Sequence, residues 1–308
     1  MPNTYTFEQK VASFRRTADS VQERVNFMES RAAVVLGLID EQSSVRDIYT
    51  VELVPPGGST RYDIPFDDIN MVFLMPQIGS YPSINVEGDE IYVDTFALHG
   101  GVDWQEDVAR DGRFQVAERA TRLLANKFVR QEEMHGWSLI RAHAAVIPST
   151  QKLQAYLNAG TVATPGNGIM NIFTLSEALT LADELGSGGR RLTDIYMSPR
   201  RFNDLRTQVG NSALPNEMRA AAWNGGAGNI PAPEIRFHKI YNRTLVADNK
   251  AYAFTQRDGF SYGVMPIRDK VRTRDNPMAM TENKQGVLAS ERIGFAALDD
   301  KGLIEITF

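Results

Sequence analysis

The chain has 308 residues, of which 43% are hydrophobic, and it carries a formal net charge of −5 with no cysteine. This length and composition fit an ordinary globular protein with one elaborated domain or two. The acidic balance argues against sequence-independent nucleic-acid binding, which depends on clustered Lys and Arg. The lack of cysteine excludes disulfides, thiolate zinc sites and cysteine nucleophiles. The longest apolar run, residues 32–39, is far shorter than the roughly 20 residues of a membrane span, so we expect no membrane insertion.

The N-terminal segment has the most regular pattern. Its apolar residues recur alternately four and three positions apart, which predicts one long helix from about Thr6 to Leu38. Thr6 and Gln9 are spaced for a capping box at its start. Two interpretations of the apolar face stay open, packing on the chain's own body or contact with a second chain or a scaffold, because a stripe does not name its partner. The stripe consists of Phe7, Val11, Phe14, Ala18, Val21, Val25, Met28, Ala32, Val35 and Ile39.

Residues 50–105 change to strand patterns. Two alternating stretches, Asp68–Met75 and Glu90–Leu98, flank a loop rich in glycine and proline, which predicts a long β-hairpin that projects from the body. The hairpin contains no lysine, because none of the eight lysines lies between Lys10 and Lys127.

A second long helix is predicted from Arg113 to Val146. A broadly helical apolar spacing supports it, and Gly136 makes a kink in its last third a further expectation. At ~1.5 Å per residue this helix would be roughly 50 Å long. The expected buried face consists of Phe114, Ala117, Ala120, Leu124, Phe128, Met134, Trp137 and Ile140.

The segment after Pro148 mixes helical and extended signals. We predict a helix over Thr174–Leu185 with Thr174 at its cap, a short buried strand over Asp194–Ser198 and a helix from Pro199 to about Val209. The glycines and prolines of residues 224–234 predict a surface loop.

Residues 244–266 read as strand, turn, strand, turn, strand, with Asp248 and Asp258 in the turns. Tyr252 and Phe254 are expected to share one sheet face, as are Phe260, Tyr262 and Val264.

Known catalytic and ligand-binding motifs are absent from the sequence. The glycine loops lack the Walker lysine and the dinucleotide spacing, and Ser187 has the wrong frame for a nucleophile elbow. Glu132 and His135 form a single Glu-x-x-His, which lacks the second copy of a di-iron site, so we expect a solvated helix face. We therefore predict no catalytic residue, no cofactor and no metal site.

The other candidate side chains are expected to have structural rather than catalytic roles. The carboxylates Asp248, Asp258, Asp299 and Asp300 lie in predicted turns, where Asp bonds to the backbone. The remaining histidines, His99, His143 and His238, are scattered.

Three stretches carry a resemblance to a known family. They are TDIYMSPRRFNDLR (193–206), RTLVADNKAYAFTQRDGFSYGVMPIRDKVRT (243–273) and GVLASERIGFAALDDKGLIEITF (286–308). Together with the order of the elements, they resemble the major capsid proteins of tailed bacteriophages, which have the Hong Kong 97-type fold shared with encapsulins. The resemblance implies an α+β fold with a helical arm (1–54), an extended loop (55–105), a peripheral domain with a spine helix (106–147), an axial domain (148–262) and peripheral return strands (263–308).

The resemblance also implies a function and partners. It implies a non-enzymatic major capsid protein that assembles through hexamers and pentamers into an icosahedral virion shell around double-stranded DNA, in the cytoplasm of a bacterial host. Heterologous contacts that close by rotation build such rings. Separate scaffolding, portal and cement proteins are possible partners, and the DNA would be held by confinement without sequence specificity. An encapsulin-type compartment is the alternative, and an α/β enzyme using carboxylates of residues 148–262 is a more distant one.

Two departures from the family carry predictions. Some members crosslink their shells through an extended-loop lysine, which this hairpin lacks, so we predict no crosslinking through it. Members with a built-in scaffold have a longer N-terminal extension, so we predict that the helix within Phe7–Ile39 is needed for assembly.

Overall fold

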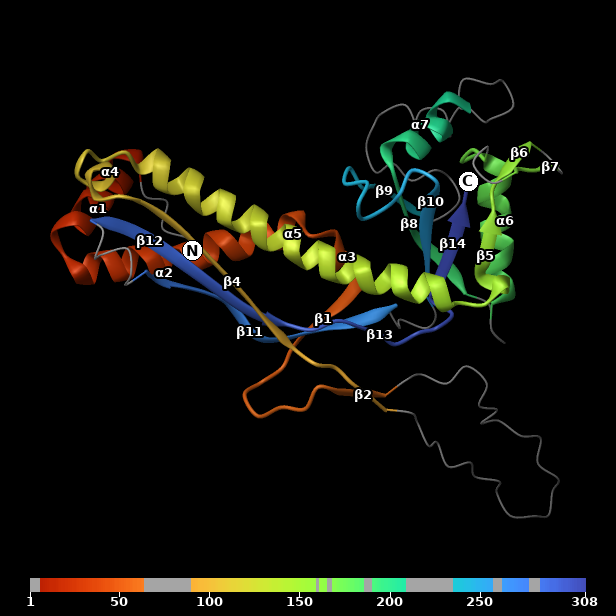
Figure 1. Ribbon diagram of the computed structural model, residues 1–308, viewed down its shortest axis with the longest axis horizontal. Helices are drawn as coiled ribbons and strands as arrows, with labels where there is room; N and C mark the ends of the chain where they lie inside the picture. The colour runs from red at the N-terminus through yellow and green to blue at the C-terminus, as the bar shows by residue number, and fades with distance from the viewer. Residues whose placement is uncertain are drawn as a thin grey trace, which may run out of the picture.

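The computed structural model describes residues 6–63, 90–158, 161–164, 168–185, 190–208, 235–256, 262–276 and 283–308. In Figure 1 these residues form an elongated molecule in which one long helix runs above a twisted sheet and reaches a second sheet at the far end. The predicted features on Asp68–Met75, Ser187, residues 224–234, Asp258 and Phe260 lie outside the described residues.

The N-terminal segment forms two helices, α1 (Phe7–Asp19) and α2 (Val21–Gln42), so the prediction of one continuous helix is wrong. Ser20 separates them with extended backbone (φ −136°, ψ 125°), and its side chain accepts a hydrogen bond from the Glu23 amide. Serine favours such a cap because its hydroxyl satisfies a first-turn amide. The predicted capping box of Thr6 and Gln9 is confirmed.

The two arm helices fold back on each other and pack on the body of the same chain. The Phe14 and Phe27 rings lie 5.2 Å apart across the bend. Met28, Val35 and Ile39 are fully buried, in a core with residues of the long helix and of the first sheet. The interpretation that the apolar stripe packs on its own chain is confirmed for these residues.

The first sheet has the strand order β1, β11, β12, β4, with the short β13 beside β11. β1 runs parallel to β11, and the remaining pairs are antiparallel. β11 continues through Pro266, where the prediction ended a strand. The bounds are β1 (Tyr49–Leu53), β4 (Phe96–Gln105), β11 (Gly263–Asp275), β12 (Lys284–Ile293) and β13 (Ala296–Ala297).

The helix α5 (Phe114–Val146) confirms the second long helix, 33 residues without interruption. Gly136 does not kink it. A Cβ at Gly136 would lie 2.5 Å from Cγ1 of Val45, and the Tyr49 hydroxyl donates to the Gly136 carbonyl. The glycine therefore allows the short helix α3 (Ser44–Ile48) to approach α5 closely. Another short helix, α4 (Glu106–Arg110), precedes α5.

The second sheet has the strand order β5, β14, β10, β8, β9. It shares an apolar core with α6 (Ile172–Glu184) and α7 (Pro199–Gln208). The bounds are β5 (Lys152–Gln154), β8 (Arg191–Met197), β9 (Arg236–Lys239), β10 (Lys250–Gln256) and β14 (Leu303–Thr307). The short strands β6 (Tyr156–Asn158) and β7 (Thr161–Val162) pair beside this sheet, and the 3₁₀ turn η1 (Ser149–Gln151) precedes it.

The start of α6 and the last strand correct two predictions. The cap of α6 is Asn171, whose side chain accepts from the Thr174 amide, while the Thr174 hydroxyl accepts from the Tyr156 amide. β14 joins the second sheet between β5 and β10, so the prediction that residues 263–308 all return to one peripheral sheet is wrong for this strand. An alternating apolar strand does not specify its sheet.

The segment around β10 is partly as predicted. Residues 243–249 form turns rather than the first expected strand, and Asp248 lies in a turn as expected. Tyr252 and Phe254 share one face and contact the cluster around Trp137. Tyr262 and Val264 pack in different clusters, because β11 begins only at Gly263.

The base of the predicted hairpin is present. β2 (Arg61–Asp63) pairs antiparallel with β3 (Glu90–Tyr92), away from both large sheets in Figure 1. Among the described residues, no helix is long and apolar enough to cross a bilayer.

Substituting Gly136 tests the contact between α3 and α5. Gly136→Ala should lower the free energy of unfolding by roughly 1–3 kcal/mol, because the added methyl meets the fully buried Val45. Gly37→Ala in α2 is the matched control, since nothing lies within 4 Å of its Cβ position. That change should raise stability by about 0.5–1 kcal/mol through helix propensity alone. Urea unfolding measures both, and equal effects would contradict the close approach.

Candidate functional site

A buried ion cluster joins α3, α5 and β12. Nη2 of Arg46 lies 2.8 Å from Oε1 of Glu132 and 2.8 Å from Oε1 of Glu291, and Nε of Arg46 donates to Oε2 of Glu132 at 3.1 Å. Both carboxylate side chains are fully buried, and the exposed Asp40 pairs with Nη1 at 2.5 Å. One guanidinium thus holds two buried carboxylates, a two-pronged geometry that Arg provides and Lys does not.

The cluster holds more negative than positive charge in its interior. Oε2 of Glu291 has no hydrogen-bond partner among the described residues. Burial, reinforced by the charge of Glu132, raises the pKa of Glu291 to about 8, although Arg46 opposes the shift. Burial also disfavours the charge on Arg46, but its bonds to Glu132 and the charge of Glu291 outweigh this and raise the pKa of the guanidinium. Glu291 therefore keeps its proton to a higher pH than an ordinary glutamate does.

The prediction for the Glu-x-x-His pair is wrong for Glu132. The carboxylate faces inward to Arg46 rather than to solvent, because α3 places an arginine over that turn of α5. His135 is exposed, and its ring lies 4.6 Å from Phe96. Among the described residues, no three His, Asp or Glu side chains are grouped so as to hold a metal ion.

The other candidate side chains have structural partners. Asp299 is buried, pairs with Arg190, and accepts from the Lys301 amide in a turn. Asp300 is exposed and lies 3.6 Å from Nε2 of His143. These contacts fit the predicted structural role of the turn carboxylates.

The two remaining candidate histidines differ in their contacts. His238 bonds to Asp194 at 2.8 Å, and its ring stacks on Tyr196. His99 lies on β4 opposite Ser290. Within the described residues, the candidate carboxylates and histidines do not come together in one solvent-accessible site.

Exposed apolar side chains form the other notable feature. On α5, Val116, Leu123 and Met134 are 41%, 52% and 44% exposed, and their spacing places them on one stripe of the helix. Met134 was expected in the buried face and is not there. Exposed apolar side chains aligned along one helix are candidate residues for contact with another chain.

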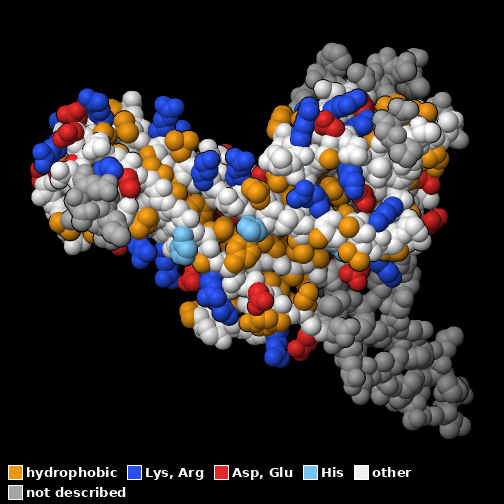
Figure 2. Space-filling view, viewed as in Figure 1, with side chains coloured by type: hydrophobic (Ala, Val, Ile, Leu, Met, Phe, Trp, Pro, Cys, Tyr) orange, Lys and Arg blue, Asp and Glu red, His pale blue; other side chains and the backbone are white. Residues whose placement is uncertain are grey.

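Two further groups of exposed apolar residues lie near the hairpin and the second sheet. The first is Val51, Leu53 and Tyr92, and the second is Leu157, Val162, Ile172 and Phe173. In Figure 2 hydrophobic side chains gather over the middle of the molecule, between its two lobes. The sequence analysis missed the α5 stripe, because it assigned Met134 to the buried face and did not single out Val116 and Leu123.

The chain resembles solved structures of capsid and particle proteins. A virus-like particle from Pyrococcus furiosus matches with a TM-score of 0.53 and 16% identity, covering 92% of this chain and 100% of that chain. A structure of Microbacterium phage Oxtober96 matches with a TM-score of 0.56 and 14% identity over 86% and 90% of the two chains. The capsid of Ralstonia phage GP4 gives a TM-score of 0.54 and 14% identity over 87% and 86%.

These structures have the Hong Kong 97-type capsid fold, and this chain has the same fold. The predicted fold class is therefore confirmed. No protein-family model matches the chain, and no curated protein matches it in sequence.

The buried cluster predicts a pH dependence of stability. The pKa of Glu291 in the folded protein, about 8, lies above its ordinary value of 4.5, so the folded state binds the proton more tightly. The contribution of Glu291 to stability should therefore fall as the pH rises from about 5 to 8, by on the order of 1 kcal/mol per pH unit. Glu291→Gln cannot titrate and should flatten this slope.

The control is Glu90→Gln, which removes an exposed carboxylate on β3. It should leave the pH dependence of the free energy of unfolding as in the parent protein. Urea unfolding across this pH range measures the slopes. If Glu291→Gln had the same pH dependence of the free energy of unfolding as the parent protein, Glu291 would not be the group that titrates.

Proposed function

We propose that the protein is a shell-forming capsid protein that assembles with copies of itself. The fold likeness over 86–92% of the chain is the observation that carries the proposal. The exposed apolar groups on α5, near the hairpin and beside the second sheet supply surfaces for such contacts. A two-stranded ribbon is marginal in water, so the projecting hairpin would gain stability from a neighbouring copy.

The finer form of the proposal is the major capsid protein of a tailed bacteriophage. Hexamers and pentamers would form an icosahedral shell around double-stranded DNA, assembled in the cytoplasm of a bacterial host. The net charge of −5 is compatible with DNA held by confinement, since a strongly basic wall would trap the polymer. Scaffolding, portal and cement proteins remain candidate partners, and we propose no enzymatic role.

The predicted domain division is kept as part of this proposal, with one change. Residues 55–105 would form the extended loop that reaches a neighbouring subunit, and α5 the spine helix. The axial domain would comprise residues 148–262 together with β14, because β14 pairs with β10 and β5.

The arm is also part of the proposal. We keep the prediction that it is needed for assembly. A chain that begins near Val45 would not test this cleanly, because removing Phe14, Met28 and Val35 also opens the core. Surface variants of α1 and α2 would separate assembly from folding.

Assembly can be tested on the full chain. Size-exclusion chromatography and negative-stain microscopy should reveal closed particles far larger than the 34.3 kDa subunit. The contents of particles purified from the natural source, DNA or a protein cargo, would distinguish a virion from an encapsulin-type compartment. A compact monomer or small oligomer with enzymatic turnover would contradict the proposal.

The apolar stripe of α5 offers a sharper test. The double variant Leu123→Glu and Met134→Glu should reduce the particle yield by about tenfold or more, because it places charges in a contact that excludes water. The matched control is the double variant Gln115→Glu and Asn126→Glu, which adds the same two charges at exposed positions of α5 off the stripe. Circular dichroism should show equal folding in both. If the double variant Leu123→Glu and Met134→Glu formed particles at the normal yield, the α5 stripe would not be part of the interface between subunits.

Crosslinking through the extended loop is expected to be absent. Because no lysine lies between Lys10 and Lys127, particles boiled in detergent should give a single band at the subunit mass of 34.3 kDa. A ladder of covalent multimers mapped to residues 55–100 would contradict this prediction.

A further inference from the structure

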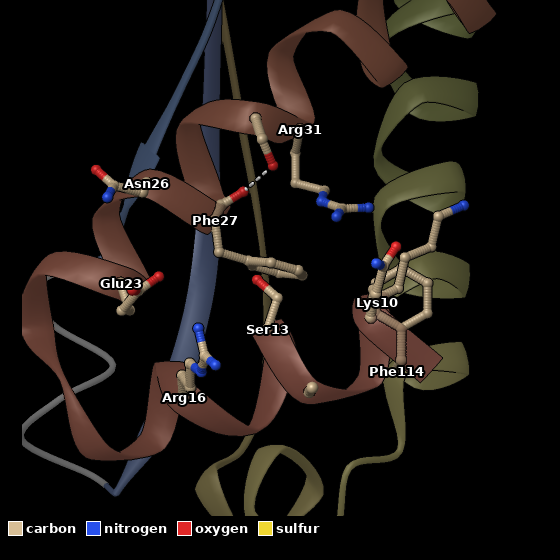
Figure 3. Close-up of a pocket in the computed structure, with 11 residues that line it drawn as sticks. Lys10, Ser13, Arg16, Glu23, Asn26, Phe27, Arg31 and Phe114 are labelled. Atoms are coloured by element: carbon tan, nitrogen blue, oxygen red, sulfur yellow. Dashed lines mark hydrogen bonds between the residues drawn. The ribbon is translucent and has the colours of Figure 1, made fainter. Parts of the chain in front are cut away.

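A cavity of about 500 Å³ lies between α1, α2 and the start of α5 (Figure 3). Helix α1 contributes Lys10, Ser13 and Arg16 to its lining, and α2 contributes Glu23 and Arg31. The bend at Ser20 creates this space by turning α1 back along α2.

The lining is cationic although the chain is acidic. It contains three cationic side chains, Lys10, Arg16 and Arg31, and one carboxylate, Glu23, for a net charge of +2. Lys10 and Arg16 are exposed. In Figure 3, Arg16 and Glu23 extend into the space between the two arm helices, and Arg31 extends beside the Phe27 ring.

Arg31 is held in place by aromatic rings rather than by a hydrogen bond at its Nε. Its guanidinium carbon lies 4.2 Å from the ring centroid of Phe27 and 5.3 Å from that of Phe114. Its Nε is buried, and no described residue accepts a hydrogen bond from it. Stacking on aromatic rings fixes the plane of a guanidinium and leaves its N–H groups free for an acceptor in that plane.

The charge of Arg31 is also poorly compensated. Burial lowers the pKa of the guanidinium, and the opposing carboxylate is Glu118. Glu118 accepts a hydrogen bond from Arg122 at 3.0 Å and is thus shared with a second cation. A partly buried cation that shares its nearest carboxylate is weakly compensated, so a negative charge in the cavity would interact favourably with it.

We propose that this cavity binds acidic side chains of a partner polypeptide. A carboxylate fits the two-pronged geometry of the Arg31 guanidinium, and the Phe27 and Phe114 rings offer an apolar wall for its stem or for a neighbouring apolar residue. Lys10 and Arg16 attract further acidic groups of the same segment.

A peptide fits the cavity better than a nucleic acid does. Duplex DNA carries one charge per about 1.7 Å of its axis and is bound by extended basic surfaces, whereas this is a single local hollow that includes the carboxylate of Glu23. The inference goes beyond self-assembly, because it concerns a second kind of polypeptide, and it can be measured whether or not the protein forms shells.

Calorimetric titration of the full-length protein with a short polyglutamate peptide at low salt tests the proposal. We expect saturable binding that weakens about tenfold in the double variant Lys10→Gln and Arg16→Gln. Both positions are exposed, so the fold should be retained. Arg31→Gln should weaken binding at least as much, and its circular dichroism spectrum is checked alongside.

The matched control is the double variant Lys127→Gln and Arg130→Gln, which removes the same charge from exposed positions of α5 outside the cavity. It should bind polyglutamate like the parent protein. If both double variants weakened polyglutamate binding equally, the binding would depend only on the net charge of the protein, and the proposed site would be overturned. No binding of polyglutamate, or stronger binding of a single-stranded oligonucleotide that depends on Lys10 and Arg16, would also overturn it.

Discussion

The continuity of α5 is the constraint on which the rest of the structure depends. Its first half carries Phe114, Leu124 and Phe128 into the core shared by the arm helices and the first sheet. Its second half presents Trp137, whose ring lies 5.5 Å from Tyr196 and 5.8 Å from Tyr252 of the second sheet. One uninterrupted helix is buried at both ends, and the cluster around Trp137 contains side chains of both sheets, so the helix and this cluster together fix the orientation of the sheets.

The ion cluster stands where this helix passes from one core to the other. Glu132 lies between the two buried halves of α5, and Arg46 connects it to β12 and to the segment that leads into β1. A buried ion cluster of this kind fixes the relative positions of its elements more than it stabilises the fold. Replacing a buried ion pair by apolar residues often leaves the free energy of unfolding unchanged. In this protein the cluster also holds a carboxylate, Glu291, whose proton affinity depends on that geometry.

Much of the fold could be predicted from the sequence, and the failures have a common cause. The ends of α5 and the cap at Thr6 follow from local periodicity and hydrogen bonding, which a single sequence contains. The break at Ser20, the burial of Glu132 and the sheet joined by β14 depend on residues far along the chain. For the same reason the cavity between α1 and α2 could not be predicted, because a straight helix would have kept its basic residues apart.

The burial of the arm sets an order on folding. The Thr17 hydroxyl donates to the Gln285 side chain, and the Thr273 hydroxyl donates to the carbonyl of Met28, so the arm helices are completed by strands that lie 268 and 245 residues further along the chain. Contacts so distant in sequence form late and slowly. Without β11 and β12, α1 and α2 lack part of the core on which they pack. The apolar faces of α1 and α2 therefore stay exposed until the strands that bury them have been made.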